Sequence, residues 1–412
     1  MRSSTSPRQS QVCLTLSARV SIVSYWYDQY DNNNGGYVRR GLIGGVLWAL
    51  TASAAAQGSV TLYGVADAAV DYVSAKGAAA GSAADKSGLT RLSSQGSYWG
   101  IRGSEDLGGG LDAIFQLEGN FSIDSGASST PFFNRDTFVG LRHRPVGALT
   151  LGVNTTSVRA LGNALDLTPG ANTGIGALQS LVSSMNGIST DHDSRLQNSV
   201  RYRSASFYGV EIGAQYGFGE ARAEGTGRND YVIGAGLAYS SGPLYIAYAY
   251  EDRHDKNKTG LAQANGHDEK HRVGVKYQVT EQWLIGALYD RSASNGQFSN
   301  GDGRLRRDAW ALVTEYDWGV HEIYAMYARA SDISCQGATA GNGVNCGSSS
   351  QTGAQLWTFG YNYNLSKRTM IRTTISKIFN QAAAKYDFSN GRTGAAAGAD
   401  PFGVSVGLRH RF

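Results

Sequence analysis

Apolar and polar residues alternate along many short segments of the chain. In residues 210–218, every second residue from Val210 to Phe218 is apolar, and the residues between them are polar or glycine. Segments 272–278 and 357–364 show the same alternation. Because successive side chains of a β-strand point to opposite faces, this period of two predicts strands with one apolar and one polar face.

Turn signals divide the chain into hairpins from Ser59 onward. Short turns rich in Gly, Pro, Asn, Asp or Ser are predicted at 106–110, 144–147, 204–209, 241–243, 279–281, 317–319 and 364–367. Longer polar loops are predicted between them, for example at 77–88, 252–268, 292–303 and 381–398. These hairpins, with one further strand at each end, make about 16 strands, and such alternation of short turns with long loops is typical of a transmembrane β-barrel.

One stretch between two short turns is much longer than the others. Residues 147–204 hold two predicted strands and a segment, 156–194, that has the character of neither a strand nor a linker. A loop of this length within a single domain is usually functional. We therefore predict that it folds into the lumen as a constriction; a mobile external loop is the alternative.

Alternation alone fits two architectures, a soluble sandwich with its apolar face inward and a membrane barrel with its apolar face outward. The aromatic residues gather near the strand ends, as in the interfacial girdles of membrane barrels. Abundant Gly (54) and Tyr (23), with only 6 Pro, suit many aromatic strands joined by glycine turns. The sequence favours an all-β fold, a transmembrane antiparallel barrel over residues 57–412.

The N-terminal region has the pattern of a secretory signal. Two arginines precede an apolar run at 41–50, and small residues follow it up to Ala56. This order predicts a signal peptide over residues 38–56, cleaved after Ala56. Residues 1–37 precede it, and we predict that translation starts at Val38; an unusually long N-terminal region is the alternative.

Removal of the signal changes the charge balance. Residues 1–56 contain five of the 37 basic and two of the 33 acidic residues, so 32 basic and 31 acidic residues remain. A nearly neutral chain gives no support to nucleic-acid binding.

Two of the three cysteines enclose a small polar loop, Cys335 to Cys346. In an oxidising compartment this spacing predicts a local disulfide. A metal site is the alternative, although no other Cys or His lies nearby. Cys13 lies in the segment that is discarded.

The chain ends in one more alternating segment. Every second residue from Phe402 to Phe412 shares one face, and most of these residues are apolar. A terminal Phe on such a strand is a sign of outer-membrane barrels. We predict that Phe412 is the signal read by the barrel assembly machinery.

Several segments together carry a family resemblance: 59–67, 100–118, 133–141, 149–152, 198–202 and 409–412. They resemble the general diffusion porins of Gram-negative bacteria, betaproteobacterial type. The resemblance spans residues 57–412 and implies an outer-membrane barrel of sixteen strands, usually a homotrimer, with the third external loop folded inward. It implies passive diffusion of small hydrophilic solutes and ions.

Strand parity and this resemblance together give the candidate constriction residues: Arg102, Arg135, Arg201, Arg203, Glu118 and Asp166. In the family, arginines that match Arg135 line the constriction opposite carboxylates of the inward loop. The loop has few acids here, Asp166 and then Asp191 and Asp193 near its end. Arginine-rich walls that face an acid-poor loop predict a mild anion preference.

The chain departs from the family pattern at positions that matter for the pore. Tyr98 stands where the family often has Arg, and Val153-Asn154 stand where it often has Arg-Gln. Residues 167–170 replace an acidic signature of some constriction loops. These differences predict a constriction that is wider or less charged than usual.

No catalytic constellation stands out, and no nucleophile elbow organises a serine hydrolase site. His254, His267 and His271 fall in or beside one polar loop. A metal site there is an alternative, but we favour a solvated loop and predict neither cofactor nor enzyme activity. A substrate-specific channel and a structural or adhesive barrel with a plugged lumen remain the alternative functions.

Overall fold

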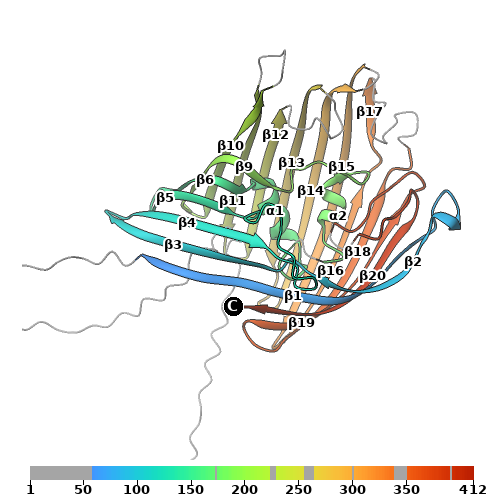
Figure 1. Ribbon diagram of the computed structural model, residues 1–412, viewed down its shortest axis with the longest axis horizontal. Coiled ribbons are helices and arrows are strands. Elements are labelled where there is room, and N and C mark those ends of the chain that lie inside the picture. The colour runs from blue at the N-terminus through green and yellow to red at the C-terminus, as the bar shows by residue number, and fades with distance from the viewer. Residues whose placement is uncertain are drawn as a thin grey trace, which may run out of the picture.

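The computed structural model describes residues 58–171, 174–222, 229–254, 264–298, 301–337, 350–389 and 392–412. Most of them form one antiparallel sheet that closes on itself, because the first strand, β1 (Ser59–Lys76), pairs with the last, β20 (Asp400–Arg411) (Figure 1). The predicted signal peptide and the N-terminal extension lie outside the described residues and stay predictions.

The other strands of the closed sheet follow in chain order: β2 (Lys86–Ser94), β3 (Tyr98–Gly108), β4 (Leu111–Asn120), β5 (Thr137–His143), β6 (Gly147–Thr155), β9 (Arg195–Ser204), β10 (Val210–Arg222), β11 (Asn229–Ser241), β12 (Leu244–His254), β13 (Ala264–Gln278), β14 (Trp283–Phe298), β15 (Gly301–Trp318), β16 (His321–Ala330), β17 (Ser334–Gly337), β18 (Ala354–Asn364) and β19 (Thr369–Asn380). A short 3₁₀ helix, η1 (Ser82–Ala84), lies between β1 and β2.

In two places, two consecutive segments together form one barrel strand with a local break. β2 and β3 both pair with β1 and are separated only by residues 95–97, while β16 and β17 both pair with β15 and are separated by residues 331–333. Counted in this way, the described sheet is a closed barrel of sixteen antiparallel strands. The predicted strand number is confirmed.

The apolar faces of the strands point outward. On β10, Ile212 is 53% exposed and Phe218 is 52% exposed, whereas the intervening Gln215 is 5% exposed. The last strand follows the same rule, with Leu408 exposed and Arg409 buried. An exposed apolar surface around a polar interior is the reverse of the arrangement in a soluble protein, and it matches strands that contact lipid.

The short turns all lie where they were predicted, but two of the predicted loops are partly strand. At 252–268, β12 continues to His254 and β13 begins at Ala264. At 292–303, β14 continues to Phe298 and β15 begins at Gly301, so most of this predicted loop is strand. Ser292 in this segment is compatible with a strand because it points inward to a polar partner; Arg307 Nη2 donates to Ser292 Oγ at 3.1 Å. Polar composition therefore misled the prediction.

Cys335 lies in β17 and is disulfide-bonded. Its predicted partner, Cys346, lies outside the described residues, so the pairing stays a prediction.

The segment between β6 and β9, residues 156–194, is partly helical. It contains α1 (Ser157–Leu165), α2 (Gln179–Val182) and two-residue strands β7 (Ser184–Met185) and β8 (Ile188–Ser189), none of which the sequence pattern predicted. Thr156 caps α1 by accepting a hydrogen bond from the Arg159 amide at 3.1 Å. No described helix is long and apolar enough to cross a membrane.

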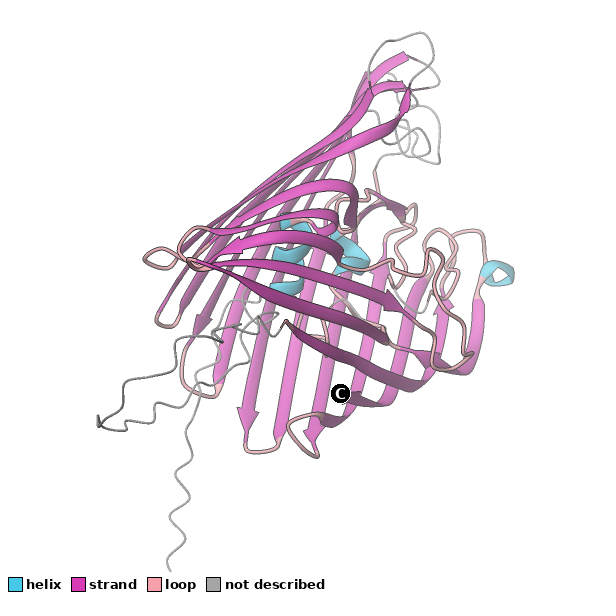
Figure 2. Cartoon of the chain, turned by 60° about the vertical axis from the view of Figure 1, so that its left-hand side comes forward, coloured by secondary structure: helices cyan, strands magenta, loops and turns pink. Residues whose placement is uncertain are grey.

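Both helices of this segment, which we call the third loop, lie within the ring of strands (Figures 1 and 2). α1 contacts β11 to β14, and α2 contacts β15, β16 and β18. The fully buried side chains of the third loop include Leu161, Leu165, Leu178 and Leu181. Each buried leucine stabilises this contact by about 1.5–3 kcal/mol.

Part of the wall beneath the third loop is apolar on both faces. On β15, Ala311 and Val313 are buried against the loop, while Trp310 and Leu312 between them are exposed on the outer face. The expectation of a polar inner face is therefore wrong for this part of the wall. The third loop covers it, so apolar side chains there do not meet water.

The outward orientation predicts a large cost for a charge on the lipid face. Leu237→Arg on β11 is expected to lower the free energy of unfolding in a bilayer by about 2–4 kcal/mol, because Leu237 is half exposed on the outer face. Urea unfolding in lipid vesicles measures this difference. The control, Arg203→Gln on the inward face of β9, is expected to change it by less than about 1 kcal/mol. Equal costs for the two variants would contradict the assignment of the faces.

Candidate pore constriction

A buried network of charged residues holds the third loop against the inner wall. Arg272 on β13 donates to Asp290 Oδ2 at 2.8 Å and to Asp193 Oδ2 at 3.0 Å. It also donates to the Val158 carbonyl of α1 at 2.9 Å. One wall arginine is thus bonded to the beginning and the end of the third loop.

Two further wall cations bind the carbonyl groups at the end of α2. Lys270 Nζ donates to Val182 O at 2.5 Å, and Arg307 Nη1 donates to Leu181 O at 2.6 Å. Arg307 is also paired with Asp290 at 2.8 Å. The last carbonyl groups of a helix have no partner within it, so these cations satisfy acceptors that would otherwise be buried and unbonded.

Asp193 is the acid of this network that belongs to the loop. Burial alone would raise the pKa of Asp193, but the facing Arg272 and Lys270 outweigh burial and hold this pKa well below its ordinary range. Asp193 is therefore ionised at neutral and at mildly acidic pH, and its negative charge is neutralised by the wall.

A second anchor fixes the middle of the third loop. Asp67 on β1 pairs with Arg409 at 2.8 Å and with Arg372 at 2.9 Å. Arg409 also donates to Pro169 O at 3.2 Å. The next residue, Gly170, has a φ of +90°, and a Cβ atom there would lie 2.5 Å from the Arg409 guanidinium, so only glycine fits.

The candidate loop acid Asp166 is buried and bonded within the third loop. Its Oδ1 accepts hydrogen bonds from the Thr168 amide at 3.0 Å and from Thr168 Oγ1 at 2.6 Å, and its Oδ2 accepts one from the Leu178 amide at 3.0 Å. These bonds close the loop backbone on itself. A role for Asp166 as a pore acid stays a prediction.

Three of the predicted arginines lie on the inward faces of β3 and β9. Arg102, Arg201 and Arg203 are half-buried, and they share their face with the buried Gln116 and Gln215. Their directly opposite residues are uncharged: Thr61 and Gln116 at Arg102, Thr150 and Gln215 at Arg201, Ala148 and Gly213 at Arg203. The parity prediction is consistent with this placement.

Arg135 and Glu118 form an ion pair at the root of the loop between β4 and β5. Arg135 Nε lies 2.7 Å from Glu118 Oε2, and its guanidinium lies 4.0 Å from the centroid of the Tyr98 ring. Tyr98 stands where the family that the sequence resembles often has arginine. Here the ring supports a neighbouring cation by a cation–π contact instead of adding a charge.

Two basic residues beside this pair, Arg159 and Arg195, were not among the candidate residues predicted from the sequence. Arg195 Nε pairs with Asp136 Oδ2 at 2.9 Å, and Arg159 Nη1 donates to Asp193 O. Burial, and next the guanidinium groups of Arg195 and Arg135, lower the pKa of Arg159 to about 9. Arg159 is still charged at neutral pH, so three cations lie close together.

Neither residue could be placed by counting strand positions. Arg159 lies on α1, a helix that the alternation did not predict. Arg195 is separated from Arg201 by a register shift, and Asn198 within it has a φ of +51°. The alternation that places Arg201 therefore does not extend across this irregularity to Arg195.

A cavity of about 510 Å³ lies between the third loop and the segment that joins β19 to β20. The third loop contributes Gln179, Ser183 and Asp191 to its lining, and the other segment contributes Lys385 and Asp387. Hydrophilic groups of both signs surround this space, which suits water and small solutes.

The chain matches the family of Gram-negative porins over residues 45–383. It belongs to this family. The closed barrel with outward apolar faces agrees with the match, and the porin is an outer-membrane channel of Gram-negative type.

Individual relatives extend the comparison over nearly the whole porin. An outer membrane porin protein of Bordetella pertussis is 28% identical over 90% of this chain and 99% of its own length. Outer membrane porin protein 32 of Delftia acidovorans is 29% identical over 91% of this chain and 100% of its own length. The solved structure of an anion-selective porin from Comamonas acidovorans is 27% identical, with a TM-score of 0.68, and covers 86% of this chain and 100% of its own.

The network around Asp193 predicts how firmly the third loop is held. Asp193→Asn removes the loop's charge from two buried cations, Arg272 and Lys270, and is expected to weaken the anchoring by about 3 kcal/mol, which is roughly a 100-fold faster amide exchange in α1. Hydrogen–deuterium exchange with mass spectrometry measures this rate.

The matched control is Asp191→Asn, because Asp191 lies two residues away and its carboxylate accepts only a local bond from Ser189 among those shown. It is expected to leave exchange in α1 unchanged. Since the pKa of Asp193 is depressed in the folded porin, the stabilisation is complete above the ordinary carboxyl pKa of about 4 and is lost only below it. Loss of protection between pH 7 and pH 5 would contradict this account.

Proposed function

We propose that this porin is a diffusion channel for small hydrophilic solutes and ions, with a mild preference for anions, in which the third loop narrows the lumen. The single observation that carries the proposal is the arrangement of charge around the third loop. One of its acids, Asp193, is neutralised by the wall behind it, while Arg102, Arg201 and Arg203 lie on the inward faces of β3 and β9.

The contacts of the third loop support its position as a constriction. α1 and α2 pack on the inward faces of β11 to β18, and three wall cations bond to their backbone. A loop bound to one side of a barrel leaves its passage along the other side, here the face with Arg201 and Arg203. The permeating solute would then pass between the loop and these arginines.

The electrostatics of such a passage favour anions. Arg135, Arg159 and Arg195 add cations near the root of the third loop, and the low-dielectric walls of a narrow pore focus their field. The acids Glu118 and Asp136 are paired with two of these cations, which makes the preference mild. The similarity to an anion-selective porin supports the same sign of selectivity.

Two further properties belong to this proposal. The porin would assemble as a homotrimer, as the family resemblance implies. Phe412 would be read by the barrel assembly machinery; its backbone pairs with Gly64 on β1, and its ring is exposed on the outer face. Cross-linking in detergent tests the trimer, and Phe412→Ala, with slower assembly in cells, tests the signal.

Selectivity is tested by removing two of the inward charges. Arg201→Gln combined with Arg203→Gln is expected to lower the anion-to-cation permeability ratio by about twofold or more, because the local positive potential falls. The reversal potential of channels in a planar bilayer under a salt gradient measures this ratio. Arg291→Gln is the matched control, since Arg291 pairs with Asp308 on the outer face and is expected to leave the ratio unchanged.

The same bilayers separate the proposed function from its alternatives. Clear cation preference of the unmodified porin would contradict the proposed selectivity. Saturable block by one solute would indicate a substrate-specific channel, and absence of any conductance would indicate a structural or adhesive barrel. Hydrolysis of lipid or peptide by the folded porin would contradict a purely passive channel.

A further inference from the structure

A cluster of ligand-type side chains lies on the outer face of the barrel, away from the lumen. Asp252 and His254 end β12, and His267 lies opposite His254 on β13. They share the outward face with Tyr248, which is exposed lower on β12. Asp252 and His254 lie at the end of β12 remote from the short turn at 242–243, beyond the aromatic residues of that strand, and His267 lies beside them on β13.

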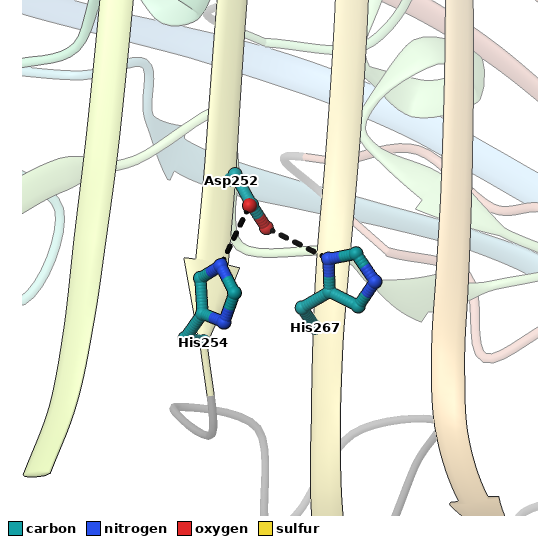
Figure 3. A group of neighbouring side chains, drawn as sticks. All are labelled: Asp252, His254 and His267. Carbon is teal, nitrogen blue, oxygen red and sulfur yellow. Dashed lines mark hydrogen bonds and ion pairs between the residues drawn. The ribbon is translucent and has the colours of Figure 1, made fainter. Parts of the chain in front are cut away.

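The Asp252 carboxylate brings the two imidazole rings together. His254 Nε2 lies 2.7 Å from Asp252 Oδ2, and His267 Nδ1 lies 3.2 Å from Asp252 Oδ1 (Figure 3). One ligand atom from each residue lies within 4.8 Å of the other two. Small side-chain rotations would bring all three to the 2.0–2.2 Å bond lengths of a zinc site.

The rings are held in this orientation by their neighbours. His254 stacks on Tyr231 with ring centroids 4.3 Å apart, and His254 and His267 stack with centroids 5.2 Å apart. Glu269 Oε1 lies 3.6 Å from His267 Nδ1 and could become a further ligand or orient the ring. The side chains of Asp252, His254 and His267 are 13%, 32% and 33% exposed, so an ion could reach them from solvent while most of each side chain is supported.

We propose that Asp252, His254 and His267 bind a divalent transition-metal ion of the zinc class on the outer rim of the barrel. Two imidazole nitrogens and one carboxylate oxygen are borderline ligands, which suit Zn²⁺, Ni²⁺ or Cu²⁺ and not Mg²⁺ or Ca²⁺. The remaining coordination positions are open to water or to Glu269. The sequence alone favoured a solvated loop here. The position of the Asp252 carboxylate between the two histidines follows only from the pairing of β12 with β13.

A bound ion would link the two strands at one end of their hairpin. Asp252 and His254 come from β12 and His267 from β13, so the three bonds cross the strand boundary. Such a link restricts local separation of the strand ends, in the way that metal binding is coupled to local order elsewhere. The site is separate from the pore, so its loading need not alter ion selectivity.

Isothermal titration of the tag-free, metal-stripped porin in detergent tests the proposal, with Zn²⁺, Mg²⁺ and Ca²⁺ as separate titrants. One Zn²⁺ per chain is expected, and neither Mg²⁺ nor Ca²⁺ should bind at the same concentrations. His254→Gln and His267→Gln are each expected to weaken Zn²⁺ binding by at least about 10-fold. X-ray absorption of the loaded porin is expected to show nitrogen and oxygen ligands with two imidazoles.

His271→Gln is the matched control. His271 lies on the same face of β13, but its Nδ1 is bonded to Tyr248 Oη at 2.8 Å, so the variant should bind Zn²⁺ like the unmodified porin. The heat-dependent gel mobility of folded barrels identifies any variant that has not folded, and Asp252→Asn then provides a third test of the site. Absence of stoichiometric Zn²⁺ binding, or equal losses in His271→Gln and His254→Gln, would overturn the proposal.

Discussion

The constraint on which this structure depends is the pairing of every backbone polar group within hydrocarbon. An isolated sheet edge in lipid would leave unpaired amide and carbonyl groups at a cost of several kcal/mol each. β1 therefore pairs with β20 over twelve residue pairs, from Val65–Arg411 to Lys76–Asp400, and the sheet has no free edge there. Once the sheet is closed, the period of two decides the rest: one face contacts lipid, and the other encloses the interior.

Burying a charged group in the enclosed interior costs free energy, and charged groups of the inner wall nevertheless hold the third loop in place. Buried cations are costly unless they are paired and hydrogen-bonded. Arg272 and Arg307 meet this requirement by bonding both to Asp290 and to backbone carbonyls of the loop. The apolar contacts of Leu161 and Leu181 add non-directional attraction, and the charged network specifies one arrangement of the loop on the wall.

The main elements of the fold were predictable from the sequence because they follow from local rules. Alternation at 210–218 gave the strand and its two faces, and the turn residues gave the strand number. The helix α1 was not predictable in this way, because it is stabilised by the wall behind it as well as by its own pattern. Val313 and Ala311 carried a signal for this packing, since a strand that is apolar on both faces must be covered on both.

The positions of the candidate pore residues were predictable only where the strand geometry is regular. Arg102, Arg201 and Arg203 follow regular alternation and lie on the expected face. Arg195 lies beyond an irregular step at Asn198, and Arg159 depends on the fold of the third loop, so neither could be placed from sequence. Asp193 was noted as an acid of the loop, but its neutralisation by Arg272 depends on contacts between residues 79 positions apart.

The central claim is that the third loop borders the conducting passage, and a single-channel measurement with a thiol reagent tests it most directly. Ser189 is exposed on β8 of the third loop, so Ser189→Cys offers a reactive group on the exposed surface of this loop. Modification by a bulky, charged, thiol-specific reagent added to an open channel should cause a stepwise fall in current. An unchanged current, with modification verified by mass spectrometry, would contradict the account.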